Sequence, residues 1–413
     1  MSTKKLQTLK GFRDFLPEEK RRRDFIMAKV KQTFEIFGFE PLETPTLEYS
    51  SVILGKYGKE ADKMVYSFKD KGGRNLSLRY DQTVPTARVL AQYQAKLPKC
   101  FRRYQLQNVF RADKPQAGRY REFTQCDIDI FGSTSPLADA EIIACTYFSF
   151  KNVGYPNIIL RLNDRQVLFD VLKPFSSKKL SLLSIIQTVD KLDKKPKSDV
   201  IKELVTKGLT LKQTNQALKA INQAKISDNL KQIITLSQSL GVPEKALDFS
   251  PSLARGLDYY TGMIFEVILP KYKIGSFGGG GRYDNLINQL SGINIPAVGI
   301  AFGFDRMVEA ATEMKLIPTV GIGTQVLVTI FDKTTTKASA QIAQKLRQAN
   351  ISTEIYPDQD KLDKQLKFAN KKAIPFVLII GPDEAKANQV TLKDMATGQQ
   401  QTLPLDQVIN KLK

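Results

Sequence analysis

Residues 110–132 read FRADKPQAGRYREFTQCDIDIFG, which brings basic, turn-forming, aromatic and acidic residues close together. Arg111 lies near the start, Pro115 and Gly118 mark a loop, and the run CDIDIF near the end has period-two alternation. A strand, a tight loop and a returning strand produce this pattern. The hairpin would hold arginines beside carboxylates and the ring of Phe123. Because guanidinium groups bind phosphate and a flat ring suits a base, we expect a site for a nucleotide and a second, smaller polar ligand.

The overall composition is that of a globular protein with an unusual charge. The 413 residues predict two or three domains, and the 42% hydrophobic and 25% charged contents are ordinary. Lys and Arg number 62 against 42 Asp and Glu, which gives a formal charge of +20. Because the basic residues are scattered through the chain, this surplus indicates a nucleic-acid partner more than a membrane. The alternative is a lysine-rich surface that only improves solubility.

The cysteines and the apolar segments exclude several other classes. Cys100, Cys126 and Cys145 are widely spaced and form no CxxC pair, so we expect neither a zinc site nor a disulfide framework. The N-terminal residues MSTKKLQTLKG contain no apolar run, which argues against a secretory signal. The longest clean apolar run, residues 376–380, is far too short to span a bilayer. We therefore expect a cytoplasmic protein that does not interact with membranes.

The sequence contains no histidine. This removes the commonest general base and the commonest metal ligand. Any chemistry must use carboxylates, arginines, lysines, tyrosines and a metal ion that arrives with the substrate. The absence itself is either selected or the result of compositional drift.

The first hundred residues predict helices and short strands. Pro17 precedes an apolar stripe that predicts a helix over residues 18–37. Residues 39–54 contain two prolines and predict either an edge strand or an irregular connector. Two short strands at residues 64–69 and 76–80 follow, joined by a turn. Asp81 and Thr83 then stand at a helix start, where such residues act as caps unless they bind a ligand.

The rest of the chain changes character twice. After a helix around residues 137–150, residues 171–247 predict a helical insertion. Residues 173–240 contain 13 Lys, no Arg and 5 acidic residues, which indicates a basic face. Strands are expected at residues 263–269 and 297–302, with a run of four glycines between them that allows close backbone approach. A small α/β domain with a parallel or mixed sheet follows residue 323.

Six segments together resemble the histidyl-tRNA synthetase family of class II aminoacyl-tRNA synthetases, from residue 10 to the C-terminus. RGLDYYTG is nearly diagnostic of this family within class II. The segments are KGFRDFLP at 10–17, LRYDQTVPTAR at 78–88, FRADKPQAGRYREFTQCDID at 110–129, RGLDYYTG at 255–262, GGGGRYDNL at 278–286 and GIAFGFDRM at 299–307.

The resemblance implies an α+β fold, with a class II antiparallel sheet flanked by helices. It implies a catalytic domain over residues 1–322 that carries the helical insertion at 171–247, and an anticodon-binding α/β domain over residues 323–413. The segment around Pro45 resembles motif 1, which builds the dimer interface in this family. The implied partners are tRNA(His), L-histidine, ATP and a second copy of the chain.

The resemblance also implies an ATP site. Arg111 and Arg255 look like the two arginines that bind the α-phosphate from opposite sides and stabilise charge during the reaction. Phe123 and Arg306 resemble the pair that sandwiches adenine. Mg²⁺ would enter with ATP, and no tightly bound metal is implied. The implied ATP-binding residues are Arg111, Asp113, Arg119, Phe123 and Arg306, where Arg119 reaches the outer phosphates.

The implied histidine site has two ends. The first end holds the ammonium and carboxylate groups, and the second end holds the imidazole. The residues of the first end are Asp81, Gln82, Thr83 and Gln125, and those of the second end are Asp129, Tyr259 and Tyr260. Asp127, one step from Asp129, is expected to differ in environment and receives no role. The chain has Gln105 and Thr124 where relatives often carry histidine, and Asp113 where Glu is more usual.

Two other functions are compatible with such a fold. One is a catalytically silent relative, such as the regulatory subunit of the short ATP phosphoribosyltransferase, which generally lacks the anticodon domain and has altered versions of RGLDYYTG. The other is an RNA-binding protein that uses the fold only as a scaffold. The intact Arg111, Arg255 and 323–413 module favour a working synthetase that makes histidyl-adenylate from histidine and ATP and transfers the histidine to tRNA.

Overall fold

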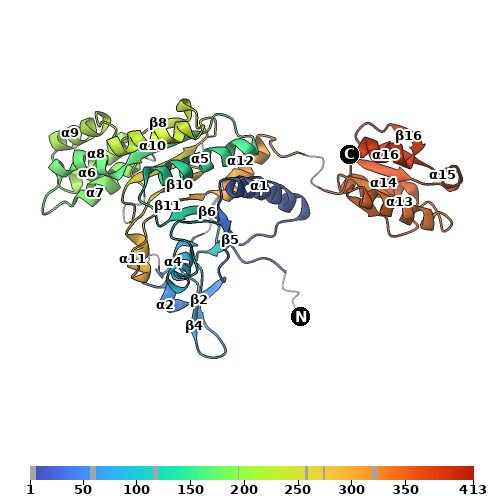
Figure 1. Ribbon diagram of the computed structural model, residues 1–413, viewed down its shortest axis with the longest axis horizontal. Coiled ribbons are helices and arrows are strands. Elements are labelled where there is room, and N and C mark those ends of the chain that lie inside the picture. Colours follow the sequence, from blue (N-terminus) through green and yellow to red (C-terminus); the bar gives the residue numbers. More distant parts are fainter. Residues whose placement is uncertain are drawn as a thin grey trace. The chain divides into compact units, whose positions relative to one another are not determined.

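The computed structural model describes residues 6–55, 62–114, 120–193, 195–255, 259–272, 275–318 and 323–413. The chain divides into two compact units (Figure 1). One comprises Ile26–Leu316 with the residues that precede Pro17, and the other comprises Pro17–Phe25 and Ile317–Lys413. Within the described ranges, no helix is long and apolar enough to cross a membrane.

A large sheet forms the centre of the first unit. Its strand order in the described residues is β1-β5-β6-β11-β10-β9-β7-β8. The edge pairs β1–β5 and β7–β8 are parallel, and the pairs between them are antiparallel. The strands are β1 Glu40–Pro41, β5 Phe101–Phe110, β6 Glu122–Phe131, β7 Ile159–Asp164, β8 Leu247–Phe249, β9 Met263–Ile268, β10 Gly278–Arg282 and β11 Ala297–Phe302. This is the predicted class II arrangement.

Two details of this sheet bear on the sequence predictions. The hairpin is confirmed, because β5 and β6 pair from Phe101 opposite Phe131 to Phe110 opposite Glu122. The proline-bearing segment does supply an edge strand, β1. For the glycine run the sequence predicted a close approach of the backbone and no strand, whereas the run forms the interior strand β10. Glycine disfavours strands on propensity alone, so only the packing of the neighbouring strands explains this placement.

Helices cover one face of the sheet and form its main core. The principal ones on this face are α1 Pro17–Ile36, α5 Pro136–Val153 and α12 Phe304–Glu313. The predicted stripe of α1 is confirmed, since Ile26, Val30 and Phe34 are fully buried. The Phe34 ring lies 5.4 Å from that of Phe302 on β11. Burying each of these side chains contributes about 1.5–3 kcal/mol to the free energy of unfolding. The helices on this face therefore hold the sheet in position.

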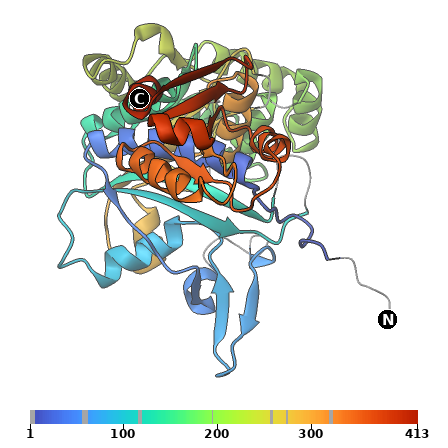
Figure 2. The same ribbon diagram turned by 90° about the vertical axis from the view of Figure 1, so that its right-hand side faces the viewer.

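The opposite face carries shorter elements and a small second sheet. The short helices are α2 Ser50–Ile53, α4 Thr83–Gln92 and α11 Leu286–Ser291. The small sheet, of order β2-β4-β3, contains β2 Leu47–Tyr49, β3 Ser67–Lys69 and β4 Asn75–Leu78. Figure 2 shows this sheet projecting from the rest of the unit. The two strands predicted at residues 64–69 and 76–80 are thereby confirmed, in shortened form.

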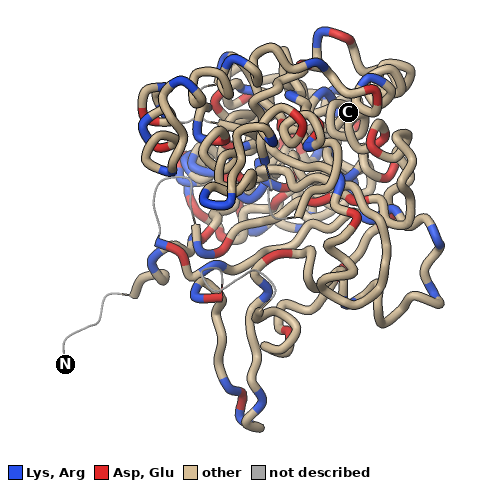
Figure 3. Tube along the Cα trace, turned by 90° about the vertical axis from the view of Figure 1, so that its left-hand side faces the viewer, with Lys and Arg blue, Asp and Glu red and all other residues tan. Residues whose placement is uncertain are grey.

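The helical insertion follows β7 and precedes β8. Its apolar side chains form a core of their own around Ile185, Leu204 and Leu218, and α10 packs against α5. The helices are α6 Arg165–Leu172, α7 Leu182–Val189, α8 Lys197–Thr206, α9 Leu211–Asn222 and α10 Asp228–Ser239, with 3₁₀ turns at Lys173–Phe175, Asp190–Asp193 and Glu244–Ala246. Lys and Arg are spread over many elements of the chain rather than gathered in one segment (Figure 3).

The second unit contains a mixed sheet of order β13-β12-β14-β15-β16 in the described residues. The first three strands are parallel and the last two are antiparallel. Apolar clusters lie on both faces, around Leu346 on one and Ile374 on the other. The elements are β12 Val326–Val328, α13 Thr336–Gln348, β13 Thr353–Ile355, α14 Leu362–Lys371, β14 Phe376–Ile379, α15 Pro382–Ala387, β15 Gln389–Asp394, β16 Gln400–Pro404 and α16 Leu405–Leu412. The predicted small α/β domain with a parallel or mixed sheet is thereby confirmed.

Candidate active site

The candidate site lies on the face of the large sheet opposite α1 and α5. In antiparallel pairs, residues directly opposite each other point to the same face. On β6, the side chains of Cys126, Ile128 and Ile130 are fully buried in the core below the sheet. Gln125, Asp127 and Asp129 alternate with them and lie opposite Gln107, Gln105 and Arg103 of β5. We call these six residues, with Gly299 and Ala301 opposite them on β11, the polar floor.

The glycines of β10 and β11 leave room above this floor. Gly299 and Ala301 pair with Asp129 and Asp127, respectively. A Cβ atom on Gly299 would lie 1.9 Å from Oδ1 of Asp129, and a Cβ atom on Gly279 would lie 2.2 Å from Nη1 of Arg255. Real side chains never approach so closely. Gly279 in the glycine run of β10 therefore leaves room for the side chain of Arg255, and Gly299 on β11 leaves room for that of Asp129.

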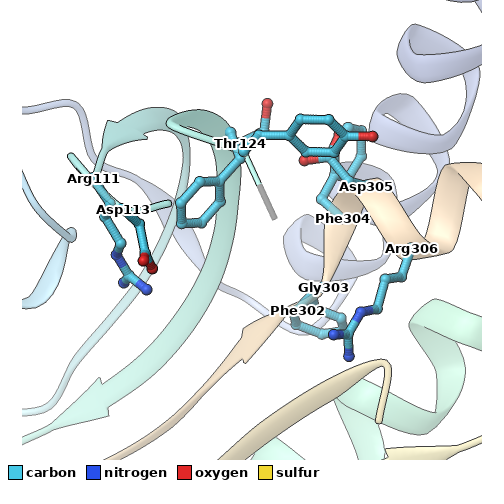
Figure 4. Close-up of a pocket in the computed structure, with 10 residues that line it drawn as sticks. Arg111, Asp113, Thr124, Phe302, Gly303, Phe304, Asp305 and Arg306 are labelled. Atoms are coloured by element: carbon cyan, nitrogen blue, oxygen red, sulfur yellow. The ribbon is translucent and has the colours of Figure 1, made fainter. Parts of the chain in front are cut away.

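A pocket of about 190 Å³ opens at one end of the site. Arg111 and Asp113 lie on one side and Arg306 of α12 lies on the other (Figure 4). Phe123 also lines the pocket, and its ring centroid is 5.1 Å from the guanidinium carbon of Arg111. Nη1 of Arg306 donates to the carbonyl of Ser276 at 2.6 Å. Four of the five residues predicted to bind ATP therefore surround one pocket, and the fifth, Arg119, lies outside the described residues.

Arg111 and Arg255 enter the site from distant parts of the chain. Nε of Arg111 donates to the carbonyl of Tyr80 at 3.2 Å. Arg255 is held by the Glu266 carboxylate at 3.1 Å and by the Ser276 hydroxyl at 2.5 Å. Desolvation raises the pKa of the Tyr259 hydroxyl, whereas both arginines lower it. Both cations therefore act on the same hydroxyl group, although Arg255 does not line the pocket described above.

At the other end of the floor, Asp129 is held by two buried partners. Nη2 of Arg103 lies 2.7 Å from Oδ2, and the Tyr283 hydroxyl donates to Oδ1. Burial raises the pKa of Asp129, while Arg103 and the Tyr283 hydrogen bond lower it. Tyr260 lies beside this group in the same apolar cluster as Tyr283, and burial raises the pKa of its hydroxyl well above the usual value. This end combines a carboxylate with two phenol groups in a dry environment.

The residues predicted to bind the ammonium and carboxylate groups of histidine differ in their hydrogen-bond partners and burial. Oδ1 of Asp81 accepts the N–H of Val84 at 3.1 Å and so contacts the first turn of α4, whose N-cap residue is Gln82. Thr83 is the first residue of α4. Gln82 is fully buried, and its amide donates to the carbonyls of Gln107 and Gln125 at 3.2 and 3.1 Å. Gln82 is thus bound to the backbone of both floor strands, β5 and β6.

Asp127 is the floor residue for which the sequence suggested no role. It is 3% exposed, and its Oδ1 has no hydrogen-bond partner. The pKa of Asp127 is raised to about 8, chiefly by burial; the charges of Asp129 and Asp81 contribute to the rise, while Arg103 and Arg111 oppose it. Its environment differs from that of Asp129, as expected. The two carboxylates nevertheless share one face, because they are two residues apart on a strand.

Several residues of the site were missed from the sequence. Arg103 and Tyr283 hold Asp129, and Glu266 holds Arg255. Arg13 of the KGFRDFLP segment stacks on Tyr120, 3.3 Å from its ring centroid, and its Nη2 lies 2.9 Å from Oδ1 of Asp305. The alternation of β5 could have indicated Arg103, but the other partners depend on strand order. Among the described residues, no group of three or more Cys, Asp or Glu side chains is arranged to hold a metal ion.

Comparisons with known proteins agree with this geometry. The histidyl-tRNA synthetase family profile matches residues 11–307, and an anticodon-binding domain profile matches residues 325–413. The histidine–tRNA ligase of Wolinella succinogenes is 38% identical over 95% of both chains, and that of Gloeobacter violaceus is 36% identical over 97% of both. The crystal structure of histidyl-tRNA synthetase from a Nostoc species superposes with a TM-score of 0.88, at 30% identity over 98% of both chains. The chain therefore belongs to the histidyl-tRNA synthetase family of class II aminoacyl-tRNA synthetases.

Proposed function

We propose that this protein ligates L-histidine to tRNA(His) in two steps, through a histidyl-adenylate intermediate. In the first step, histidine and ATP give histidyl-adenylate and pyrophosphate. In the second, the 3′-terminal ribose of the tRNA displaces AMP. The observation that carries the proposal is that Phe123, which lines the pocket with Arg111 and Arg306, lies on the same strand and, by alternation, on the same face as the buried, held carboxylate of Asp129.

The first step needs charge stabilisation more than proton transfer. The histidine carboxylate attacks the α-phosphorus, the bond to the pyrophosphate oxygen breaks, and negative charge grows on the non-bridging oxygens. Arg111 and Arg255 are proposed to stabilise this charge, as fixed donors do in an oxyanion hole. The nucleophile is already an anion, so no general base is needed and the lack of histidine side chains costs nothing. Mg²⁺ enters as the counter-ion of ATP.

The nucleotide pocket is proposed to bind the rest of ATP. Adenine would lie between the ring of Phe123 and the guanidinium of Arg306, where stacking and cation–π contact combine. Asp113 and Arg119 are proposed to contact the ribose–phosphate part. The hydrogen bond from Arg306 to the Ser276 carbonyl supports this arrangement, because it fixes the guanidinium before the ligand arrives.

The floor is proposed to select histidine by hydrogen bonds. Asp129 accepts one imidazole N–H, and Tyr260 with Tyr259 completes the pocket for the second ring nitrogen. An analogue without these groups would leave buried polar atoms unpaired, which costs about 1–3 kcal/mol for each of them. Asp81, Thr83 and Gln125 are proposed to bind the ammonium and carboxylate groups. Gln82 keeps its place in the site as a support for the floor, since its amide is already engaged.

The remaining regions are proposed to serve tRNA binding and assembly. Residues 1–322 form the catalytic domain, residues 171–247 form its insertion, and residues 323–413 bind the anticodon. The basic insertion suits the phosphate backbone of tRNA. The segment around Pro45 is proposed to build a homodimer, and the protein is proposed to act in the cytoplasm.

Histidine-dependent ATP–pyrophosphate exchange tests the proposal. The purified protein should incorporate labelled pyrophosphate into ATP when histidine is present, and should not do so with any other standard amino acid. A protein that binds tRNA(His) but shows no exchange would contradict the proposal and support a silent relative or an RNA-binding scaffold. Exchange with another amino acid would also contradict it.

A further inference from the structure

Two neighbouring acceptors on the polar floor lack donors. Among the described residues, Oε1 of Gln125 and Oδ1 of Asp127 are buried and accept no hydrogen bond; Oδ2 of Asp129 also accepts none, but it lies 2.7 Å from Nη2 of Arg103. The two side chains follow each other along one face of β6, and Nε2 of Gln125 lies 3.4 Å from Oδ2 of Asp127. A buried acceptor without a donor costs about 1–3 kcal/mol. Two such acceptors side by side indicate a place for a ligand that brings several N–H donors.

The charges around the floor indicate that this ligand is a cation. Arg103 is the buried cation of the floor, and it forms its close ion pair with Asp129. The residues opposite Asp127 on the two neighbouring strands, Gln105 and Ala301, carry no charge. Within the described part of the chain, Asp127 is therefore a buried carboxyl group that forms no ion pair, although Arg103 and Arg111 act on it from a greater distance. An ionised carboxylate in such a position is costly until a positive charge arrives.

We propose that Asp127 is a further carboxyl group of the ammonium site, neutral in the empty enzyme, and that it releases its proton to solvent when the α-ammonium of histidine binds. The inference rests on the proposed function, which supplies histidine as the ligand. It adds to that function a coupled proton: one O–H bond of Asp127 breaks, the proton passes to buffer, and the carboxylate accepts an N–H of the ammonium. Histidine binding then becomes dependent on pH.

The groups that face Asp127 set the range of this dependence. They are Arg103 on β5, Asp129 on β6, Asp81 before α4 and Arg111 after β5, while β11 offers no charge. Burial is the largest influence, and it raises the pKa of Asp127 to about 8. The ammonium would lower that pKa again, because an opposite charge within about 4–6 Å favours the ionised form. Proton release is then largest near neutral pH and falls as the pH rises through about 8.

Calorimetric titration of the intact protein with histidine tests the proposal. The binding enthalpy is measured at about pH 7.5 in phosphate and in Tris, whose ionisation enthalpies differ. The slope of the binding enthalpy against the ionisation enthalpy of the buffer gives the number of protons released per histidine bound. We expect about half to one proton per histidine, which follows from a group that is mostly protonated when free and ionised when bound. D127N should bind histidine with a slope near zero.

Two controls isolate the group and the ligand. D228N makes the same chemical change at an exposed carboxyl group of α10, outside the site, and should retain the slope of the unaltered protein. Imidazole propionate, which lacks the ammonium, should bind without releasing a proton. Histidine binding without proton release, or equal release by D127N, would overturn the inference and leave the proposed function intact. No histidine binding at all would overturn both.

Discussion

Nη2 of Arg103 lies 2.7 Å from Oδ2 of Asp129, and both side chains are almost completely buried. This ion pair sits at the end of the polar floor where the imidazole is proposed to bind. Removing one partner of a buried pair leaves an uncompensated charge, which typically costs about 3–5 kcal/mol, whereas removing both costs less. The pair therefore links the stability of the sheet to the recognition of the substrate.

R103M should destabilise the protein by about 3–5 kcal/mol, because Asp129 is left as a buried carboxylate without a cation. The double variant R103M/D129N should recover a large part of this loss. Urea unfolding of the two single variants and the double variant gives the interaction energy directly. Strictly additive losses, within about 0.5 kcal/mol, would show that the two side chains do not depend on each other.

Y283F should weaken histidine binding more than it weakens the fold. The Tyr283 hydroxyl donates to Oδ1 of Asp129. Without it the carboxylate loses a donor and a fixed orientation, and we expect KM for histidine to rise about tenfold, equivalent to about 1.4 kcal/mol. Y155F is the matched control, because the Tyr155 hydroxyl donates to the Met307 carbonyl, outside the floor. An unchanged KM in Y283F, or an equal rise in Y155F, would contradict the role of Tyr283.

R255A should lower kcat for pyrophosphate exchange by about 100- to 1,000-fold, as the loss of one donor to a developing negative charge typically does. Binding of tRNA should be unaffected. R161A is the control variant. Nη1 of Arg161 lies 3.7 Å from Oε1 of Glu266, whose Oε2 pairs with Arg255, and Arg161 is proposed to play no part in catalysis. Similar losses in both variants would mean that Glu266, and not a phosphate, explains the effect.

G279A and G281A should fail in different ways. The added methyl group of G279A would meet the guanidinium of Arg255, a side-chain end that can move, so we expect reduced exchange activity in a folded protein. In G281A the methyl group would lie 2.5 Å from the Met263 backbone carbonyl, which cannot move without disturbing β9, so we expect lost stability. Melting temperature and exchange rate, measured for each, separate the two effects. Comparable melting temperatures with comparable activities would contradict this reading of β10.

D127N should change how the unliganded protein responds to pH. Burial raises the pKa of Asp127 to about 8 from an ordinary value near 4, so between these values the folded state retains a proton that the unfolded state has lost. The contribution of Asp127 to stability therefore falls as the pH rises from about 4 to 8. Relative to the unaltered protein, D127N should gain stability across this range. If the difference in free energy of unfolding between D127N and the unaltered protein were the same at pH 5 and pH 8, the raised pKa assigned to Asp127 would be refuted.

The sequence predicted local structure well and long-range pairing poorly. The hairpin, the stripe of α1 and the first elements of the second unit follow from periodicities in adjacent residues. The strand β10 was missed because its four glycines contradict strand propensity, and only Arg255 and the backbone of β9 and β11 explain them. The roles of the site residues followed from the resemblance to the family. The structure places most of those residues close together.

The limits of prediction were clearest at the polar floor. Tyr283 and its partner Asp129 are 154 residues apart in the chain, so nothing local joins them. Asp127 was expected to differ in environment from Asp129, but the sequence suggested no role for it. Its distinct state depends on which residues of β5 and β11 lie opposite, and thus on strand order and register. Such information is absent from any single stretch of sequence.

A crystal structure with a non-hydrolysable histidyl-adenylate analogue would show directly how the site holds its ligand. We expect the imidazole against Asp129 and Tyr260, the ammonium against Gln125 and Asp127, and the adenine between Phe123 and Arg306, with Arg111 and Arg255 on either side of the phosphate substitute. An imidazole ring bound away from Asp129, or an adenine outside the Phe123–Arg306 pocket, would contradict this expectation.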